Sequence, residues 1–417
     1  MQRNPFLVIL ILIIFFVISF LTNILGPIIP DIVRDFKLSL GLAGFLPFAF
    51  FVAYGVMSIP AGLMVEKYGE KKVLVWAFLM AFIGAFLFAI LPGFSIALLS
   101  LFLIGIGMAM LQVVINPLLR VAGGEEKFAF NSVLAQLFFG GASFLSPLLY
   151  SYLVQHVQGG ESGFLLKLLN QVVPENLKWV SLYWVFALIA LVMVLIIALI
   201  KFPKVELKDD ERIDIGGSLG ELVRSKQVWL FFLGIFCYVG TEQGIANWIS
   251  QFLQLKHGVD PGTGGASVIS NYWGLLTIGC LLGLLLLKIF DSRHVLMLFT
   301  AGAILSLFGA LFGSLEMALI AFPAIGFFAS VMYSVIFSLA LNSVPMHHGT
   351  FSGILCAGIS GGAVFPLIVG GLAEWLGLQW AMLFLLVPMG YIFSIGVWAR
   401  PLVSNDRVSS FKELFAS

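Results

Sequence analysis

The sequence Gly140-Gly-Ala-Ser-Phe-Leu-Ser-Pro147 returns, 221 positions further along the chain, as Gly361-Gly-Ala-Val-Phe-Pro366. A second match occurs at the same offset, in which a glycine, an acid and a base of one connection correspond to those of another. These residues are Gly62, Glu70 and Lys72, which match Gly283, Asp291 and Arg293. Two matches at one spacing, with no gap between them, indicate an internal repeat. The chain is therefore predicted to consist of two similar halves.

The composition places this repeat in a membrane. Of 417 residues, 60% are hydrophobic and 10% are charged, and the mean hydropathy is +1.08. A water-soluble globular protein could not bury so much apolar surface. A helix needs about 20 apolar residues to cross the hydrocarbon layer. The sequence thus predicts an all-α polytopic membrane protein with twelve transmembrane helices, at residues 6–33, 42–65, 73–91, 95–119, 129–154, 181–201, 227–252, 266–289, 295–313, 317–343, 351–376 and 380–398.

Charged residues define the boundaries and the orientation. The longest charged stretch divides the twelve spans into six and six, which predicts an N-terminal bundle, a cytoplasmic linker, a C-terminal bundle and a cytoplasmic tail at residues 1–201, 202–226, 227–398 and 399–417. With Met1 in the cytoplasm, 17 of the 22 Lys and Arg residues lie on the cytoplasmic side. This distribution favours both termini in the cytoplasm. The connections at 159–174 and 261–265 are predicted to be external loops.

The connection between the second and third spans reads Gly62-Leu-Met-Val-Glu66-Lys67-Tyr-Gly69-Glu70-Lys71-Lys72. It resembles the signature loop G-x-x-x-D-R-x-G-R-R of the major facilitator superfamily, with Glu for Asp and Lys for Arg. The resemblance implies two six-helix bundles and a substrate site between them near the membrane midplane. It also implies charges that pair across helices in one state and separate in another, although positive-inside anchoring would explain them too. The predicted gating residues are Glu66, Lys71, Lys72, Asp291 and Arg293.

Five further motifs run through most of the chain. They are Leu111-Gln112-Val-Val-Ile-Asn116-Pro117, Asn131-Ser-Val-Leu-Ala135-Gln136, Phe236-Cys-Tyr238-Val-Gly240, Asn271-Tyr272 and Tyr333-Ser-Val-Ile-Phe-Ser-Leu339. Together they resemble the fucose-galactose-glucose:proton symporter family. This resemblance implies a sugar cavity faced by Asn23, Gln136 and Tyr333. Two correspondences fail, because fucose-type members have an Asp and a Glu where this chain has Gly26 and Gln112, so both of the family's coupling acids are missing.

The seventh span contains the stretch Tyr238-Val-Gly-Thr-Glu242-Gln243-Gly-Ile-Ala-Asn247-Trp248. Glu242 is the acid deepest inside a predicted span, since Asp31, Glu316 and Glu374 lie near helix ends. Ionisable residues inside a membrane usually belong to ion or substrate pathways. Burial favours the protonated carboxylate, which could load and release a proton as the cavity hydrates and closes. Glu242 is therefore the predicted coupling group. It could bind H⁺, or it could bind Na⁺ together with the amide oxygen of Gln243 or Asn247. A purely structural Glu is the alternative.

The same span has a polar face beside an aromatic residue. Gln243, Asn247, Ser250 and Gln254 recur at helical spacing, with Trp248 alongside. Amides can hydrogen-bond sugar hydroxyls, and an aromatic ring can stack on a sugar's C–H face. Gln112 and Tyr333 are repeat mates and should face each other across the cavity, with Tyr272 and Trp273 as possible aromatic walls. The predicted substrate-binding residues are Asn23, Gln112, Gln136, Gln243, Asn247, Trp248, Asn271 and Tyr333.

Glycine pairs in the repeated motif allow helices to approach closely or to bend. Gly140, Gly141, Gly361 and Gly362 are predicted to be hinges between the rocking halves, with plain packing as the alternative. The His347-His348 pair lacks the further ligands of a metal site, and no arrangement typical of catalysis or of a phosphate loop is found.

The prediction is thus a secondary active transporter rather than an enzyme. It is expected to take up a neutral monosaccharide, such as a hexose or fucose, with a coupling cation and without a cofactor. Na⁺-coupled or facilitative sugar transport, or transport of a larger amphipathic solute, is the alternative. The expected setting is a monomer in the lipid bilayer of a bacterial inner membrane, with no nucleic-acid partner.

Overall fold

The computed structural model describes residues 5–123, 128–159, 163–200, 218–344 and 348–402. Within these residues, twelve helices are long and apolar enough to cross a membrane. The N-terminal half contains α1 (Pro5–Thr22), α2 (Leu25–Phe36), α3 (Leu40–Tyr68), α4 (Glu70–Ile90), α5 (Phe94–Gly123), α6 (Phe128–His156), α7 (Phe164–Val172) and α8 (Ser181–Leu199). The C-terminal half contains α9 (Ser218–Arg224), α10 (Lys226–Ala246), α11 (Ile249–His257), α12 (Ala266–Ile289), α13 (Ser292–Phe312), α14 (Leu315–Ala329), α15 (Met332–Leu341), α16 (His348–Ala357), α17 (Gly361–Leu376), α18 (Leu378–Met382) and α19 (Leu386–Trp398).

The predicted fold class and the number of spans are confirmed, and two details differ. Five spans are interrupted. Helices α1 and α2 are separated at residues 23–24, α10 and α11 at 247–248, and α14 and α15 at 330–331, while 3₁₀ turns, Gly358–Ser360 and Leu383–Leu385, separate α16 from α17 and α18 from α19. The connection predicted as a loop at 159–174 contains the short helix α7. Of the predicted linker, residues 202–217 lie outside the described residues, as do residues 403–417 of the tail.

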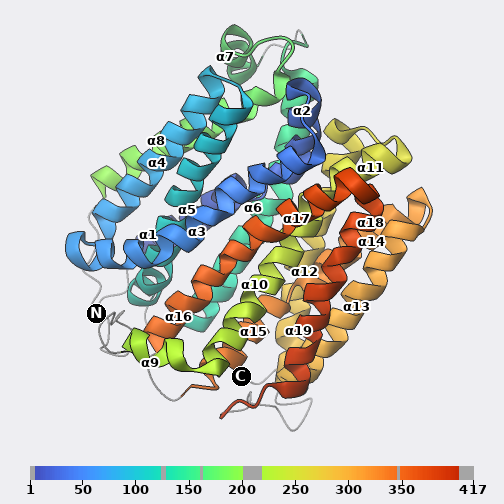
Figure 1. Ribbon diagram of the computed structural model, residues 1–417. Helices are drawn as coiled ribbons and strands as arrows, with labels where there is room; N and C mark the ends of the chain where they lie inside the picture. Colours follow the sequence, from blue (N-terminus) through green and yellow to red (C-terminus); the bar gives the residue numbers. More distant parts are fainter. Residues whose placement is uncertain (1–4, 124–127, 160–162, 201–217, 345–347, 403–417) are drawn as a thin grey trace.

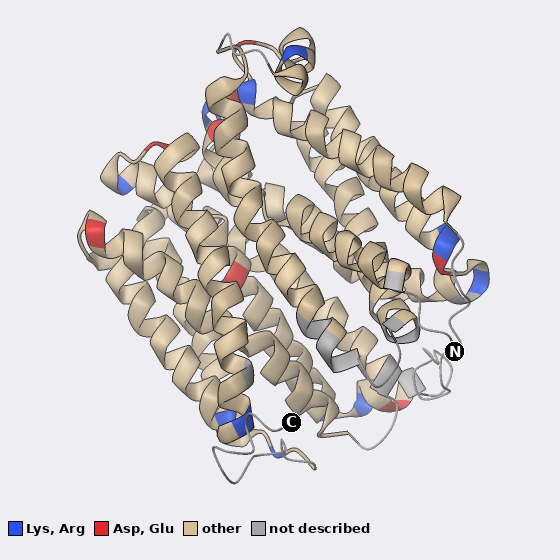
Figure 2. Ribbon diagram, turned by 180° about the vertical axis from the view of Figure 1, so that it is seen from behind, with Lys and Arg blue, Asp and Glu red and all other residues tan. Residues whose placement is uncertain are grey.

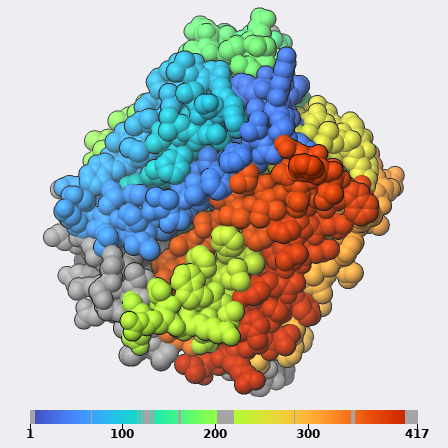
Figure 3. All heavy atoms as spheres, viewed as in Figure 1, coloured from blue at the N-terminus to red at the C-terminus, as the bar shows by residue number. Residues whose placement is uncertain are grey.

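The repeat is visible in how the two halves meet. Helix α3 packs along α17, and α6 packs along α12. A shift of 221 residues carries α3 onto α12 and α6 onto α17, so each contact is the repeat image of the other. We call these two contacts the seams. Figure 1 shows the blue and green N-terminal half beside the yellow and red C-terminal half, and in Figure 3 the two halves meet without a visible gap.

Both ends of the described chain lie on the same side of the molecule, which we call the terminal side, and α2, α7 and α11 lie on the opposite side, the far side (Figure 1). Charged residues gather mainly at these two sides (Figure 2). Between them, large apolar side chains such as Leu188 and Leu305 are exposed, at 52% and 72%. An apolar band between two charged ends is the surface expected of a protein surrounded by lipid.

Local sequence signals set several helix ends. The hydroxyls of Ser39 and Ser314 cap α3 and α14 by accepting hydrogen bonds from the backbone N–H groups of Leu42 and Met317. Helix α3 ends at Gly69, whose φ of 82° lies in the region that favours glycine. These signals fix where α3 begins and ends and where α14 begins.

Candidate functional site

A cavity of about 390 Å³ lies between the two halves. Its walls come from α1, α3, α5 and α6 on one side and from α10, α12 and α15 on the other. The exposed lining residues Gln136, Leu281 and Ser334 lie near the terminal side, whereas Asn23 and Gln243, toward the far side, are buried. The cavity is therefore accessible from the terminal side.

Close helix contacts shut the far side. A Cβ atom at Gly26 would overlap the backbone oxygen of Ala246, so only glycine lets α2 approach α10 this closely. The side chain of Gln243 donates to Asn23 Oδ1 at 3.5 Å, which joins the two halves directly. This end of the cavity is thus closed by helix packing and by a long hydrogen bond between amides.

The seam between α3 and α17 contributes a further contact at the far side. The backbone N–H of Gly41, in the first turn of α3, donates to Glu374 Oε1 of α17 at 2.9 Å. A carboxylate at a helix N-terminus also interacts favourably with the helix dipole. Glu374 therefore binds across the two halves in this conformation.

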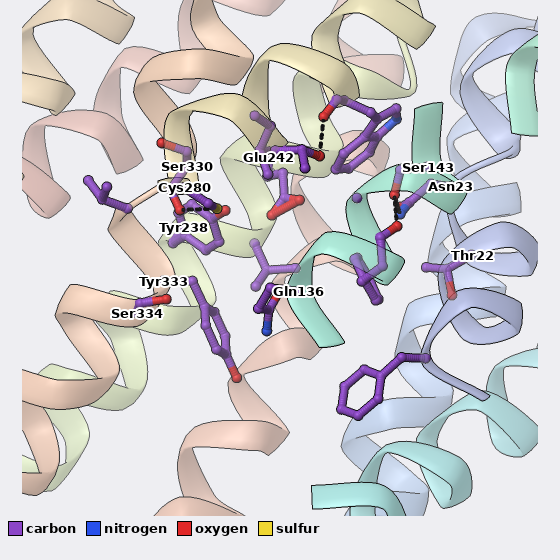
Figure 4. A pocket seen from close by; sticks show the side chains of 18 of the residues that line it. Thr22, Asn23, Gln136, Ser143, Tyr238, Glu242, Cys280, Ser330, Tyr333 and Ser334 are labelled. Atoms are coloured by element: carbon purple, nitrogen blue, oxygen red, sulfur yellow. Dashed lines mark hydrogen bonds between the residues drawn. The ribbon is translucent and has the colours of Figure 1, made fainter. Parts of the chain in front are cut away.

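The wall formed by α1 and α6 carries a hydrogen-bonded polar cluster. Asn23 Nδ2 donates to Ser143 Oγ at 2.8 Å, and the Ser143 and Ser19 hydroxyls are paired. Figure 4 shows Asn23 and Ser143 side by side, with the Gln136 side chain nearer the centre. This wall offers amides and hydroxyls and no charge.

The opposite wall carries the acid. Glu242, on α10, points into the space between the halves (Figure 4) and is partly exposed to the cavity. Tyr238 lies one helical turn earlier on the same helix and also lines the cavity. The thiol of Cys280, on α12, lies nearby and donates to the backbone oxygen of Ser330 at 3.3 Å. In the described part of the chain no Lys, Arg or His lines the cavity, so Glu242 has no cationic partner there.

A second buried acid lies outside the cavity. Asp31 is 5% exposed, and it pairs with Arg34 at 2.8 Å and accepts a hydrogen bond from Tyr150. The prediction that placed Asp31 near a helix end did not anticipate this burial. Arg34 and Tyr150 already bind the Asp31 carboxylate. Of these two acids, Glu242 is therefore the one that the described residues leave available to a solute.

Most of the predicted substrate-binding residues line the cavity. They are Asn23, Gln112, Gln136, Gln243 and Tyr333. Gln112 Oε1 accepts a weak, 3.4 Å hydrogen bond from Tyr54, and the expectation that Gln112 and Tyr333 face each other across the cavity stays a prediction. Their contact with substrate stays a prediction.

Three of the predicted substrate-binding residues do not reach the cavity in this conformation. Asn247 Nδ2 donates to the backbone oxygen of Gln243 at 2.8 Å and to its Oε1 at 3.2 Å, within the wall. Trp248 is fully buried, and its Nε1 donates to the backbone oxygen of Pro366 at 3.1 Å. Asn271 is exposed away from the cavity. The physical reason for the first two is the helix break at 247–248, which interrupts the face that regular helical spacing would have continued.

Several lining residues were not predicted as binding residues. They are Thr22, Ser143, Thr277, Cys280, Ser330 and Ser334. Ser143 could have been found, because it lies in the repeated motif at 140–147. The others are single small polar residues in apolar helices, and neither spacing nor composition distinguishes them from packing residues.

Lys71, Asp291 and Arg293, among the predicted gating residues whose side chains are described, form polar contacts within their own half. Lys71 Nζ donates to the backbone oxygen of Ala198 at 2.8 Å, and Lys72 is exposed. Arg293 forms an ion pair with Asp291 at 3.0 Å, and this hydrogen-bonded guanidinium holds the pKa of Asp291 below its usual value. The Glu66 side chain lies outside the described residues. A gating role thus stays a prediction.

We expect the Asp291→Ala variant to lower the free energy of unfolding by about 1 kcal/mol, because Asp291 caps α13 by accepting from the Arg293 backbone N–H. Asp291→Asn should lower the free energy of unfolding less, because the amide oxygen of asparagine can still accept the hydrogen bond that caps α13. Because ionised Asp291 is the paired form, the stabilisation should be present at neutral pH and disappear as acid protonates the group. Thermal unfolding of the purified variants between pH 7 and pH 3 measures this; equal curves for Ala and wild type would contradict it.

The predicted hinge glycines are positions of close approach. A Cβ atom at Gly140 would overlap Thr277 of the facing half, and one at Gly361 would overlap the backbone oxygen of Phe236. At Gly362 it would lie 2.9 Å from the Phe51 ring, whereas Gly141 has open space around it. Helix α6 continues without a break through Gly140 and Gly141. The structure therefore supports packing at three positions, and the hinge role stays a prediction.

Comparison with known proteins defines the family. The sequence pattern of the Major Facilitator Superfamily matches residues 11–360. Similar proteins include a glucose/galactose transporter of Brucella abortus biovar 1 (strain 9-941), 29% identical over 92% of this chain and 91% of the relative. Another is an L-fucose-proton symporter of Escherichia coli (strain K12), 24% identical over 87% of this chain and 86% of the relative.

Solved structures agree on the fold. A bacterial homolog of the human lysosomal transporter Spinster, in an inward-facing and unoccupied conformation, matches with a TM-score of 0.74 at 18% identity, covering 94% of this chain and 97% of that chain. The transporter FucP in the outward conformation matches with a TM-score of 0.67 at 24% identity, covering 94% and 98%. The predicted resemblance is confirmed, and the fold and relatives are those of transporters rather than enzymes. The chain is a multi-pass integral membrane protein and belongs to the Major Facilitator Superfamily.

Proposed function

We propose that this protein couples the uptake of a neutral monosaccharide to an inward flow of protons by alternating access. Glu242, a partly exposed carboxylate in a cavity whose described lining has no basic side chain, is the observation that carries this proposal. An acid without a cationic partner in a low-dielectric site can exchange a proton with the solution that fills the cavity. The carboxylate is neutral once it has bound a proton, and this removes the cost of carrying a charge across the membrane.

A sugar suits the rest of the cavity. The lining pairs uncharged amides and hydroxyls, such as Asn23, Gln136 and Ser143, with aromatic rings, such as Trp273 and Phe139. Sugars carry hydroxyl groups on their edges and C–H groups on their faces, and these two kinds of surface match the two kinds of lining. The names of the relatives, which mention glucose, galactose and fucose, support the same substrate class.

A larger amphipathic solute is the second candidate. Phe15, Phe51, Phe139 and Leu137 give the cavity a large apolar surface, and the superfamily fold does not determine the substrate. Displacement of a bound labelled hexose by amphipathic compounds, but not by other sugars, would favour this candidate.

The proposed setting is a monomer in a bacterial inner membrane with both termini in the cytoplasm. The excess of Lys and Arg on the terminal side of the predicted topology supports this orientation. The cavity described here would then be open to the cytoplasm.

Uptake of labelled glucose, galactose and fucose into proteoliposomes tests the proposal. An inwardly directed proton gradient should drive accumulation above equilibrium, and an Na⁺ gradient at equal pH should not. If only an Na⁺ gradient drove accumulation, the coupling ion would be Na⁺ rather than the proton. Equal initial rates with and without both gradients would show facilitative transport and would contradict coupling.

We expect the Gln136→Leu variant to weaken sugar binding by roughly three- to tenfold, the usual net worth of one hydrogen bond. Gln136 lies in α6, and its side chain reaches the cavity (Figure 4). Gln155→Leu is the matched control, since Gln155 lies in the same helix but is exposed outside the cavity and bonded to Ser151. Equilibrium binding of labelled hexose to both purified variants is the measurement, and an equal loss in both would argue against a sugar contact at Gln136.

A further inference from the structure

Trp273 lies on the face of α12 that lines the cavity. Trp273, Cys280 and Leu287 follow one another at intervals of seven residues, or two helical turns, so they share one face of the helix. All three line the cavity between the halves. Because α12 follows α11, which lies on the far side (Figure 1), Trp273 is the one of the three nearest to the closed end of the cavity.

Contacts on both sides of Trp273 hold it in this place. One turn before it, the Ser270 hydroxyl donates to the backbone oxygen of Phe144, on α6, at 2.7 Å. One turn after it, the Thr277 hydroxyl donates to the backbone oxygen of Trp273 itself at 2.9 Å. The ring of Tyr272 packs edge-on against the Trp273 ring, with centroids 5.2 Å apart. The seam between α6 and α12 therefore fixes the backbone that carries Trp273, and Tyr272 supports its ring.

The indole nitrogen of Trp273 has no acceptor. The side chain is 2% exposed, and its Nε1–H group forms no hydrogen bond with any of the described residues. Two other buried tryptophans do find acceptors: Trp179 Nε1 donates to Asp35 Oδ2 at 2.7 Å, and Trp248 Nε1 donates to the backbone oxygen of Pro366 at 3.1 Å. A buried donor without an acceptor is costly. The exception among these three indoles is thus the one that lines the cavity.

The chemistry of the indole restricts what could bind to it. An indole N–H can only donate, so its partner must present an acceptor. At the closed end of the cavity the amide oxygens already accept hydrogen bonds from other amides, Asn23 Oδ1 from Gln243 at 3.5 Å and Gln243 Oε1 from Asn247 at 3.2 Å. The hydroxyl oxygens of a sugar are acceptors, and a sugar held in this part of the cavity would bring them to the indole.

We propose that the Nε1–H group of Trp273 donates a hydrogen bond to one oxygen atom of the transported sugar, which makes Trp273 a specificity-determining residue. This inference rests on the sugar transport proposed above and adds one named contact to it. A site that hydrogen-bonds a hydroxyl rejects the analogue that lacks it, because the buried donor is then left unpaired. Trp273 should therefore discriminate against a sugar that lacks the oxygen at one particular position.

Monodeoxy analogues of the bound hexose test this contact. Their affinities are measured by displacement of the labelled parent hexose from protein in lipid nanodiscs. Wild type should bind the analogue that lacks the contacted oxygen roughly three- to tenfold more weakly than the parent, the usual effect of one hydrogen bond. In Trp273→Phe the parent hexose should lose about the same factor, and the preference over this one analogue should disappear. The preferences over the other analogues should remain.

A second variant separates the hydrogen bond from the size of the ring. Replacement of Trp273 by β-(3-benzothienyl)alanine puts a sulfur atom in place of the N–H group and keeps the bicyclic shape. It should lose the same single preference as Trp273→Phe. Trp184→Phe is the matched control, since the Trp184 indole also has no partner among the described residues but lies in α8, outside the cavity lining. Its affinities should equal those of wild type.

Three outcomes would overturn the inference. An equal loss of affinity for the parent hexose and for every analogue in Trp273→Phe would show that the ring only packs. A changed pH dependence of hexose binding with unchanged preferences would assign the indole N–H to the Glu242 carboxylate. Unchanged preferences in both Trp273 variants, while wild type binds a hexose, would refute the contact and leave the proposed function intact. If wild type binds no hexose, the proposed function itself fails, and this inference fails with it.

Discussion

Glu242→Gln is expected to abolish accumulation of sugar against its gradient while leaving sugar exchange intact. Glutamine has nearly the same shape as a protonated glutamic acid, so the cavity should still bind sugar and still change conformation. It cannot release a proton, and the driving force of the proton gradient is therefore lost. Counterflow in proteoliposomes, with unlabelled sugar inside and labelled sugar outside, measures exchange. Uptake under an imposed proton gradient measures accumulation.

A carboxylate outside the cavity provides the control for this prediction. Glu316, in the first turn of α14, is exposed and distant from the cavity, so Glu316→Gln should accumulate sugar as wild type does. Gradient-driven accumulation by Glu242→Gln at the wild-type level would show that Glu242 is structural. Loss of exchange as well as accumulation would show that the ionised form is needed for binding, as an Na⁺ ligand would require.

Gly26→Ala is expected to reduce transport by roughly fivefold or more without preventing folding. The added Cβ atom would overlap the Ala246 backbone oxygen, so α2 and α10 could no longer close the far side. Overpacking of this kind costs about 1–3 kcal/mol. A cost of this size, confined to one of two conformations, shifts their ratio by roughly 5- to 150-fold. The variant should favour the conformation that is open at the far side.

The thiol of Cys280 can report that shift, because it lines the cavity. With Cys237 and Cys356 replaced by Ala, a membrane-impermeant maleimide should label wild type mainly from the terminal side. It should label Gly26→Ala faster from the far side. Gly371→Ala is the control, since nothing lies within 4 Å of a Cβ at that position. Unchanged sidedness in Gly26→Ala would mean that the contact does not govern closure.

Hydropathy and the repeat were sufficient to predict the fold, because a bilayer requires long apolar helices and because the repeat fixes how many helices each half contains. Asn23, Gln136, Gln243 and Glu242 line the cavity, as expected because polar residues in such helices rarely face lipid; their roles stay predictions. Asn247 and Trp248 were placed on the same face because their spacing is helical. The helix breaks there, and no local signal in the sequence, such as a proline, marks the break.

The position of the missing family acid has a physical explanation only in three dimensions. The resemblance to the symporter family implies that Gly26 stands where fucose-type members carry an Asp. The structure adds that this glycine is in contact with the backbone of α10. No side chain of any kind fits there while the far side is closed. The absence of a side chain at Gly26 thus removes the acid and at the same time allows the close contact between α2 and α10.

The two seams lie on either side of the cavity and are images of each other under the repeat. The two halves could rock about an axis that runs through the middle of both seams. Contacts close to this axis would then persist in both end states. Substitutions in the middle of a seam should then change the free energies of both states alike and leave their ratio nearly unchanged. Contacts far from the axis, such as Gly26 with Ala246 and Gly41 with Glu374, move the most and therefore differ the most between the two states. Evolution can therefore adjust the balance between the two states at the ends of the molecule without altering the overall stability set by the seams.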